Sequence, residues 1–213
     1  MIENEDQARA WVEALPECDP SMIARFERFE ALLRDENDRQ NLVSAKSLDH
    51  TWSRHFADSL QLLQDVPRET SDWLDLGTGA GFPGIAIAIA RPDQETVCVE
   101  SRALRTKFLD YIVDELELTQ CRILHCRLQD VETRPFDAVS ARAFAPLPKL
   151  LELSSRFSTR DTLWRLPKGR SAARELENLR GWDHMFHVEQ SLTDADSGII
   201  CGTLAGRKKG KRA

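Results

Sequence analysis

Apolar side chains in the first third of the chain recur at the spacing of a helix face. One stripe consists of Met22, Phe26, Phe29 and Leu33, and a second consists of Leu48, Trp52, Phe56, Leu60 and Leu63. The polar residues 35–41 separate the two stripes, and residues 66–70 break the pattern. The pattern therefore predicts two amphipathic helices before residue 68, each with one face on a core.

From residue 71 onward, short apolar runs alternate with helical stretches. The pattern predicts strands over residues 73–76, 96–100, 121–126, 136–140 and 162–166, and helices over residues 83–90, 103–116 and 147–153. In the helix over 103–116, the expected buried face carries Leu104, Phe108, Tyr111, Ile112 and Leu116. This alternation indicates a parallel sheet with helices on both faces.

The C-terminal part predicts a helix over residues 171–179 and two strands, over 184–188 and 199–204. Two strands with almost nothing between them form a hairpin, so one antiparallel strand joins an otherwise parallel sheet. The expected fold class is α/β, with a mostly parallel seven-stranded sheet. We expect three parts: an N-terminal helical extension (1–68), the sheet domain (69–206) and a basic tail (207–213).

Composition places the chain among globular proteins. Of its 213 residues, 41% are hydrophobic, and the apolar run over residues 85–90 is far shorter than a membrane helix requires. The acidic first residues lack the basic region of a secretory signal. The five cysteines form no Cys-x-x-Cys pair, which argues against a disulfide scaffold or zinc ribbon and predicts reduced thiols. The reduced thiols in turn predict a cytoplasmic protein. His184 and His187 have no third ligand nearby, so we expect no metal site.

The net charge of −6 argues at first against a nucleic-acid partner, but the charge is unevenly distributed. Residues 1–70 contain 15 acidic and eight basic side chains, whereas residues 207–213 contain five basic and no acidic ones. Such a tail is typical either of a solvated segment or of a contact with phosphates.

A glycine-rich loop over residues 77–84 follows the first predicted strand of the sheet. Its glycines, Gly77 and Gly79 among them, allow backbone N–H groups to approach a ligand closely. Glu100 ends the next strand, where a carboxylate can accept hydrogen bonds from both hydroxyls of a ribose. Together these features predict a cofactor that contains adenosine.

Two cofactor classes fit this loop. Residues 79–84 satisfy the dinucleotide fingerprint, but fewer than fifty residues remain after Leu166 for the substrate domain of a dehydrogenase. Asp75 favours the other class, because its carboxylate can face the cationic end of S-adenosylmethionine, whereas it would repel a pyrophosphate. Charge complementarity thus favours the methyl donor.

Several blocks of sequence resemble one family closely. They are Asn41-Leu42, Arg54-His55-Phe56-Ala57-Asp58-Ser59-Leu60, the loop Gly77-Thr78-Gly79-Ala80-Gly81-Phe82-Pro83-Gly84, Glu100-Ser101, Ala141-Arg142-Ala143-Phe144-Ala145-Pro146 and Leu166-Pro167-Lys168-Gly169. In this order they are similar to the ribosomal RNA small subunit methyltransferase G family, also called glucose-inhibited division protein B.

The resemblance implies a methyltransferase (Rossmann-like) fold and a cytoplasmic bacterial enzyme. Such an enzyme transfers a methyl group from S-adenosylmethionine to N7 of one guanosine in 16S ribosomal RNA. Its partner would be that RNA or the small ribosomal subunit, with no membrane involved, and we expect a monomer. Methyl transfer to a small molecule or protein, and a non-catalytic module that binds an adenosine cofactor, remain as alternatives.

The resemblance also implies roles for individual residues. Gly77 and Phe82 would contact the cofactor, Leu128 and Gln129 would flank its adenine, and Arg142 would reach its carboxylate end. Family members usually have a small residue and Glu in place of Leu128 and Gln129, which predicts a backbone contact with the adenine. Asp196-Ser197-Gly198 replaces residues that are often basic, so an RNA contact there is not expected.

Four residues are candidates for substrate binding: Asn41, His55, Arg127 and Lys168. Arg127, Arg142 and Lys168 lie near the ends of three predicted strands, where a binding crevice is expected. For His55 and Asn41, a hydrogen bond within the helix packing is an equally good interpretation. Guanine N7 carries a free lone pair, so we expect no general base and no catalytic side chain, only proximity and orientation.

Overall fold

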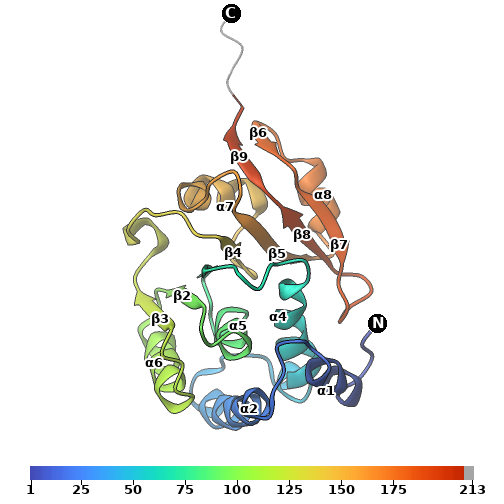
Figure 1. Cartoon of the computed structure of the whole chain (residues 1–213), viewed down its shortest axis with the longest axis vertical. Coiled ribbons are helices and arrows are strands. Elements are labelled where there is room, and N and C mark those ends of the chain that lie inside the picture. Colours follow the sequence, from blue (N-terminus) through green and yellow to red (C-terminus); the bar gives the residue numbers. More distant parts are fainter. Residues whose placement is uncertain (209–213) are drawn as a thin grey trace, which may run out of the picture.

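A seven-stranded sheet with strand order β3-β2-β1-β4-β5-β8-β7 runs through the molecule (Figure 1). It is seen in a computed structural model that describes residues 1–208. The strands are β1 (Asp72–Leu76), β2 (Glu95–Glu100), β3 (Cys121–His125), β4 (Ala138–Ser140), β5 (Leu163–Gly169), β7 (His187–Gln190) and β8 (Gly198–Gly202). Strands β1 to β5 pair in parallel, and β8 pairs antiparallel with both β5 and β7. The predicted fold class is confirmed.

The end of the chain differs from the prediction at two places. The strand expected over residues 184–188 is interrupted at Met185 and Phe186, so that β6 (Trp182–His184) ends before β7 begins. The strand expected over 199–204 is likewise divided into β8 and β9 (Leu204–Arg207). Strands β6 and β9 pair with each other in a separate two-stranded sheet. The first break consists of the apolar residues Met185 and Phe186, and the second is the single residue Thr203, which is why periodicity did not reveal the breaks.

Helices cover both faces of the main sheet. On one face lie α5 (Gly84–Ala90) and α6 (Ala103–Glu115), and α2 (Pro20–Gln40) packs on both of them as a further layer. The other face is covered by η3 (Leu128–Asp130), α7 (Leu147–Ser154), η4 (Ser155–Phe157) and α8 (Ala172–Glu177). Side chains alternate accordingly: in β1, Trp73 faces the first layer, whereas Leu74 and Leu76 face the second.

The N-terminal helices differ in detail from the predicted pair. A helix α1 (Glu5–Glu13) precedes α2, and α2 continues through the polar residues 35–40 that were expected to end it. Asp35, Asp38 and Arg39 are exposed, and Glu36 and Gln40 are half-buried. Asn37 is buried, and its side chain accepts a hydrogen bond from the Val43 N–H beyond the helix end. Asn41 then ends α2 in the left-handed conformation, at φ 44°.

The second predicted helix is divided into short pieces: α3 (Ala45–Leu48), the π-helical η1 (Trp52–Ala57), α4 (Asp58–Leu60) and η2 (Gln61–Leu63). The Glu5 carboxylate accepts hydrogen bonds from the backbone N–H groups of Trp52 and Ser53, so a new helix starts at this point. The apolar stripe is buried nevertheless from Trp52 to Leu63.

The predicted face of α6 is rotated relative to the observed one. Leu104 and Tyr111 are exposed, at 65% and 48%, whereas Leu109 is fully buried. The side chains that contact the core are centred on Leu109 and Ile112, because α6 packs between β3 and α2 rather than on the sheet alone. The prediction for this helix was correct in its limits to within one residue and correct for Phe108, Ile112 and Leu116, which are buried, but wrong for Leu104 and Tyr111.

Within residues 1–208, no helix is long and apolar enough to cross a membrane. All five cysteines are free thiols, as predicted, and β2, β3 and β8 carry three of them. Of the basic tail, Arg207 ends β9 and forms an ion pair with Glu152. Residues 209–213 lie outside the described residues, and the division of the chain at residue 68 stays a prediction.

Candidate functional site

The site lies at the carboxyl ends of the strands, where the sheet order reverses between β1 and β4. From β1 the chain proceeds to β2 and β3 on one side, and it then crosses to β4 and β5 on the other. At such a reversal the loops diverge and leave a crevice that commonly binds ligands. The sequence-predicted residues from Gly77 to Arg142 all follow strands at this edge.

The glycine loop turns sharply after β1. Gly77 and Gly79 have φ values of 70° and 63°, a conformation that favours glycine. The N–H groups of Gly77 and Thr78 both donate to the Val99 carbonyl, at 2.9 and 3.1 Å, which holds the loop against β2. A Cβ at Gly79 would make only ordinary van der Waals contacts, since the nearest atom, Arg105 Nη1, lies 3.6 Å away. The loop thus presents bare backbone toward a ligand.

Asp75 supports this loop from behind. Its carboxylate is fully buried and accepts hydrogen bonds from the Thr78 hydroxyl, the Ser140 hydroxyl (2.7 Å) and the Gly84 N–H (3.0 Å). Burial raises the pKa of Asp75. The prediction that this carboxylate faces the cofactor is wrong, because Asp75 is 0% exposed and has no surface open to the crevice.

Glu100 ends β2 with its carboxylate fixed in one orientation. One oxygen accepts hydrogen bonds from the N–H groups of Ser101 and Arg102, at 2.7 and 2.9 Å. The other oxygen lies 3.6 Å from the Arg105 guanidinium. This ion pair is long, so the second oxygen is available to accept bonds from a pair of ribose hydroxyls.

Leu128 and Gln129 lie on η3, the short helix that follows β3. Leu128 is buried in the core, whereas Gln129 is exposed. The Leu128 carbonyl accepts a hydrogen bond from Arg156. Because the Leu128 side chain is used in packing, a contact with an adenine here would involve the backbone, as expected from the sequence. Arg127 is exposed just before this turn.

Arg142 follows β4 and reaches across the crevice to η1. Its Nη1 lies 3.3 Å from Asp58 Oδ2 and 3.4 Å from the Arg54 carbonyl oxygen. Its guanidinium also lies over the Phe82 ring, 5.4 Å from the centroid. Arg142 therefore stands between the glycine loop and the N-terminal helices.

His55 is buried beside Arg142. Its ring stacks on the Phe82 ring with centroids 4.7 Å apart, and neither ring nitrogen has a hydrogen-bond partner within residues 1–208. Burial, together with Arg142 and Arg54, lowers the pKa of His55 to about 3. The ring is therefore uncharged at neutral pH, and the expected packing hydrogen bond is not formed.

This buried histidine predicts a loss of stability in acid. The unfolded chain protonates His55 below its ordinary pKa of 6.5, whereas the folded chain does so only near pH 3, so stability falls as the pH falls through this window. The contribution is about 3 kcal/mol between pH 7.5 and pH 4. Urea unfolding of the wild type and of a His55→Phe variant at both pH values measures it. Equal losses of stability in the two proteins would contradict the assignment.

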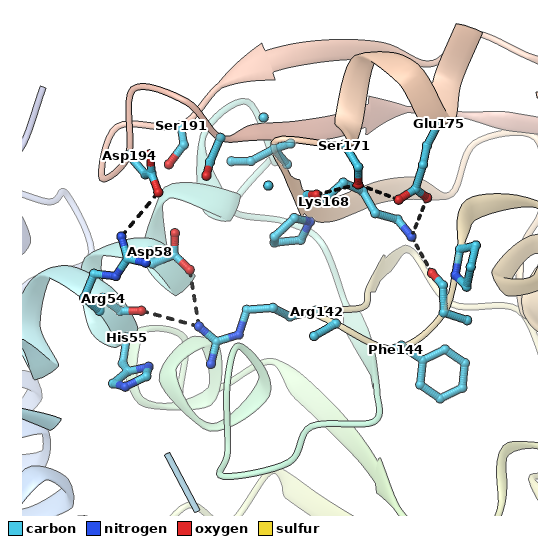
Figure 2. A pocket seen from close by; sticks show the side chains of 18 of the residues that line it. Arg54, His55, Asp58, Arg142, Phe144, Lys168, Ser171, Glu175, Ser191 and Asp194 are labelled. Carbon is cyan, nitrogen blue, oxygen red and sulfur yellow. Dashed lines mark hydrogen bonds and ion pairs between the residues drawn. The ribbon is translucent and has the colours of Figure 1, made fainter. Parts of the chain in front are cut away.

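A cavity of about 800 Å³ opens beyond Arg142 and His55 (Figure 2). Its walls come from η1, the loop between β4 and α7, the end of β5, the start of α8 and the loop between β7 and β8. Lys168 lines it, but its ammonium is already bonded to Glu175 (3.1 Å) and to the Ala145 carbonyl (2.5 Å). Asn41 and Arg127 are not among the residues that line the cavity.

Phe144 lies between the glycine loop and the cavity. It lines the cavity, and its ring packs so closely on Gly77 that a Cβ there would lie 2.6 Å from the ring. Phe144 was visible in the sequence as part of the Arg-Ala-Phe-Ala block, but it was not selected. The acidic lining residues Glu175 and Asp194 had no local signal, because they come from a helix and a loop far away in the sequence.

Comparisons with known proteins agree with this geometry. A family profile described as rRNA small subunit methyltransferase G matches residues 22–195. A protein of Novosphingobium aromaticivorans named Ribosomal RNA small subunit methyltransferase G is 51% identical over 209 residues, with 96% of this chain and 90% of the relative covered. A protein of Erythrobacter litoralis with the same name is 51% identical over 210 residues, with 98% and 100% covered.

Solved structures share the fold at low sequence identity. An O-methyltransferase from Bacillus cereus in complex with SAH superposes with a TM-score of 0.61 at 13% identity, covering 91% of this chain and 96% of that one. A methyltransferase from Geobacter sulfurreducens gives a TM-score of 0.58 at 16% identity, covering 93% and 96%. These likenesses establish the fold.

Proposed function

Because the chain belongs to the rRNA small subunit methyltransferase G family, we propose that it methylates N7 of a guanosine in 16S ribosomal RNA with S-adenosylmethionine as donor. The observation that carries the proposal is the family match over residues 22–195, which includes every predicted cofactor residue from Gly77 to Arg142. The bare backbone of Gly79 and the oriented carboxylate of Glu100 fit an adenosine cofactor.

The proposed cofactor site spans the carboxyl ends of β1, β2, β3 and β4. Gly77, Gly79 and Phe82 would form its floor, Glu100 would accept bonds from the ribose, and Leu128 and Gln129 would border the adenine. Arg142 would bind the carboxylate end, since its guanidinium already lies over Phe82. When bound, S-adenosylmethionine supplies an activated methyl group.

The proposed substrate site is the neighbouring cavity, into which the target base would enter. Phe144 offers an aromatic surface on which a purine can stack, and it touches Gly77 of the cofactor loop. His55 and Lys168 line the same cavity, and Asn41 and Arg127 would contact RNA outside it. Since guanine N7 needs no deprotonation, the chain only has to hold N7 in line with the methyl group of the cofactor and to exclude water.

We further propose that the enzyme acts in the cytoplasm as a monomer. Light scattering of the purified protein at working concentration tests the oligomeric state.

A methyl-transfer assay tests the proposed function. Unmodified small ribosomal subunits and free 16S ribosomal RNA are incubated with the enzyme and radiolabelled S-adenosylmethionine, and the label is mapped by cleavage at 7-methylguanosine. We expect label at one guanosine in at least one of the two substrates. Label in protein, at another RNA atom or only in small molecules of a cell extract would overturn the proposal.

Replacing Arg142 by alanine is expected to weaken cofactor binding by roughly 10- to 100-fold, because one charge-assisted hydrogen-bonding group is removed. Equilibrium dialysis with labelled S-adenosylmethionine measures the affinity. Arg122→Ala serves as the matched control, since Arg122 is an exposed arginine on β3 that pairs with Glu95 away from the crevice. Unchanged affinity in a folded Arg142→Ala protein would remove Arg142 from the cofactor site.

A further inference from the structure

The charges around the cavity form neighbouring pairs of opposite sign. Among its lining residues, the cationic side chains are Arg54, Arg142 and Lys168, and the carboxylates are Asp58, Glu175 and Asp194. The pairs they form are Arg54 with Asp194 (3.4 Å), Arg142 with Asp58 (3.3 Å) and Lys168 with Glu175 (3.1 Å) (Figure 2). These side chains therefore give the cavity no net charge.

His55 fits the same pattern. Its ring lines the cavity, is 5% exposed, and has both nitrogens free of hydrogen bonds within residues 1–208. Arg54 and Arg142 face this ring, and each of them is paired with a carboxylate, so neither adds a net charge beside it. A site for a phosphate group would instead require unpaired cations or a cluster of free N–H groups. Each of the three cationic side chains that line the cavity is paired with a carboxylate.

Unpaired cations do occur nearby, outside the cavity. Arg102 and Lys107 are exposed at the start of α6, beside the glycine loop, and neither forms an ion pair within the described part of the chain. The molecule thus separates two kinds of positive charge at this edge. Unpaired cations face solvent, where phosphates can reach them, whereas the cations in the cavity are neutralised.

The proposed reaction explains why a neutral cavity is useful. Transfer forms a bond between guanine N7 and the methyl carbon and breaks the bond between that carbon and sulfur, whose electron pair stays on sulfur. No proton is released, so the positive charge moves from the sulfonium to the purine. A cation without a paired carboxylate beside the base would repel the positive charge that develops on the purine, and this repulsion is stronger in a site of low dielectric constant.

We infer that Glu175, Asp194 and Asp58 are positioning residues that neutralise the cavity, so that a base which becomes cationic during methylation is held without repulsion. This inference rests on the proposed function. The cavity would accept an uncharged purine and release the same purine as a cation. It assigns Lys168 to the structure of the cavity wall rather than to phosphate binding.

Glu175→Gln tests the inference. The amide has the same shape as the carboxylate but leaves the buried Lys168 ammonium uncompensated, and we expect methyl transfer to slow about tenfold under single-turnover conditions with saturating RNA. The amide also keeps only one oxygen to accept from the Leu147 N–H and the Ser171 hydroxyl, both of which donate to Glu175, and this loss is shared by the single and the double variant. The double variant Lys168→Met/Glu175→Gln removes both charges and is expected to regain most of the rate. Glu177→Gln is the matched control, because it makes the same change at an exposed site on the same helix.

A second readout separates charge from structure. We expect Glu175→Gln to weaken binding of 16S ribosomal RNA that carries 7-methylguanosine more than binding of unmethylated RNA, because only the former brings a cationic base. If Glu175→Gln does not fold, the more exposed pair of Arg54 and Asp194 provides the same comparison. Asp194→Asn is then the single variant and Arg54→Gln/Asp194→Asn the double variant, and the expected decrease in rate is smaller.

The outcomes are distinct. A Glu175→Gln rate equal to the wild type, or a double variant as slow as the single one, would overturn the inference. Tighter binding of RNA by Glu175→Gln with no loss of rate would show that the cavity binds phosphate instead, and would overturn it as well. The wild-type enzyme is assayed in parallel, so absence of methyl transfer to RNA in every protein would contradict the proposed function itself.

Discussion

Replacing Gly79 by aspartate is expected to abolish cofactor binding while the fold stays intact. Gly79 has a φ of 63°, which aspartate tolerates better than most residues, and a Cβ there would meet no atom closer than 3.6 Å. The new carboxylate would project into the space where the cofactor must approach the backbone. Arg105 Nη1 lies 3.6 Å from the Cβ position and can pair with the new carboxylate, so it is the space taken by the side chain that opposes binding; a loss of about 3 kcal/mol corresponds to a loss of affinity of about a hundredfold.

The control for this variant is Gly79→Ala. It imposes a backbone strain at least as large, about 1 kcal/mol, without a charge. We expect measurable binding of S-adenosylmethionine by Gly79→Ala and none by Gly79→Asp, with melting temperatures within a few degrees of the wild type. Normal labelling of RNA by a folded Gly79→Asp protein would show that the glycine loop is not the cofactor site.

The largest effect on stability is expected from Asp75→Ala. The change leaves three buried donors without an acceptor: the Thr78 hydroxyl, the Ser140 hydroxyl and the Gly84 N–H. Buried donors of this kind cost about 1–3 kcal/mol each, and partial relaxation leaves an expected loss of about 3 to 5 kcal/mol in the free energy of unfolding. Urea denaturation measures this loss, and cofactor affinity is expected to fall with it because the loop loses its anchor.

Asp72→Ala is the matched control, since Asp72 lies at the opposite end of the same strand. Its carboxylate binds Arg134 and the Asp137 N–H, away from the crevice. We expect Asp72→Ala to lower stability moderately and to leave cofactor affinity unchanged. Asp75→Asn is expected to cost less than Asp75→Ala, because burial already raises the pKa of Asp75 and disfavours its charge. If Asp72→Ala and Asp75→Ala weakened cofactor binding equally, the anchoring role would be wrong.

The sequence predicts well what depends on neighbours along the chain. The strands β1 to β5 and the glycine loop have local signals, namely short apolar runs and a cluster of glycines after the first strand. Helix α6 was found, but the exposed Leu104 and Tyr111 show that its orientation depends on α2, which packs against it from a distant part of the chain. Local periodicity carries no information about such a partner.

Site residues likewise differ in whether a local signal or a contact with a distant part of the chain determines their position. Glu100 and Arg142 could be proposed as site residues because Glu100 ends one strand and Arg142 follows another, and both strand ends are visible in the sequence. The direction of Asp75 was predicted wrongly, because Ser140, one of its donors, comes from a strand 65 residues away. Glu175 and Asp194 enter the cavity only through the packing of α8 and of the loop between β7 and β8, so no spacing rule could have found them.

The aromatic contacts beneath the glycine loop limit how this protein can be shortened or recombined. The Phe82 ring stacks on Phe29 of α2, with centroids 5.1 Å apart, and on His55 of η1. Part of the floor of the cofactor loop is thus built by the segment that precedes the sheet. An engineered chimera that takes the sheet from one homologue and the N-terminal helices from another would have to exchange these three rings together to keep its affinity for the cofactor.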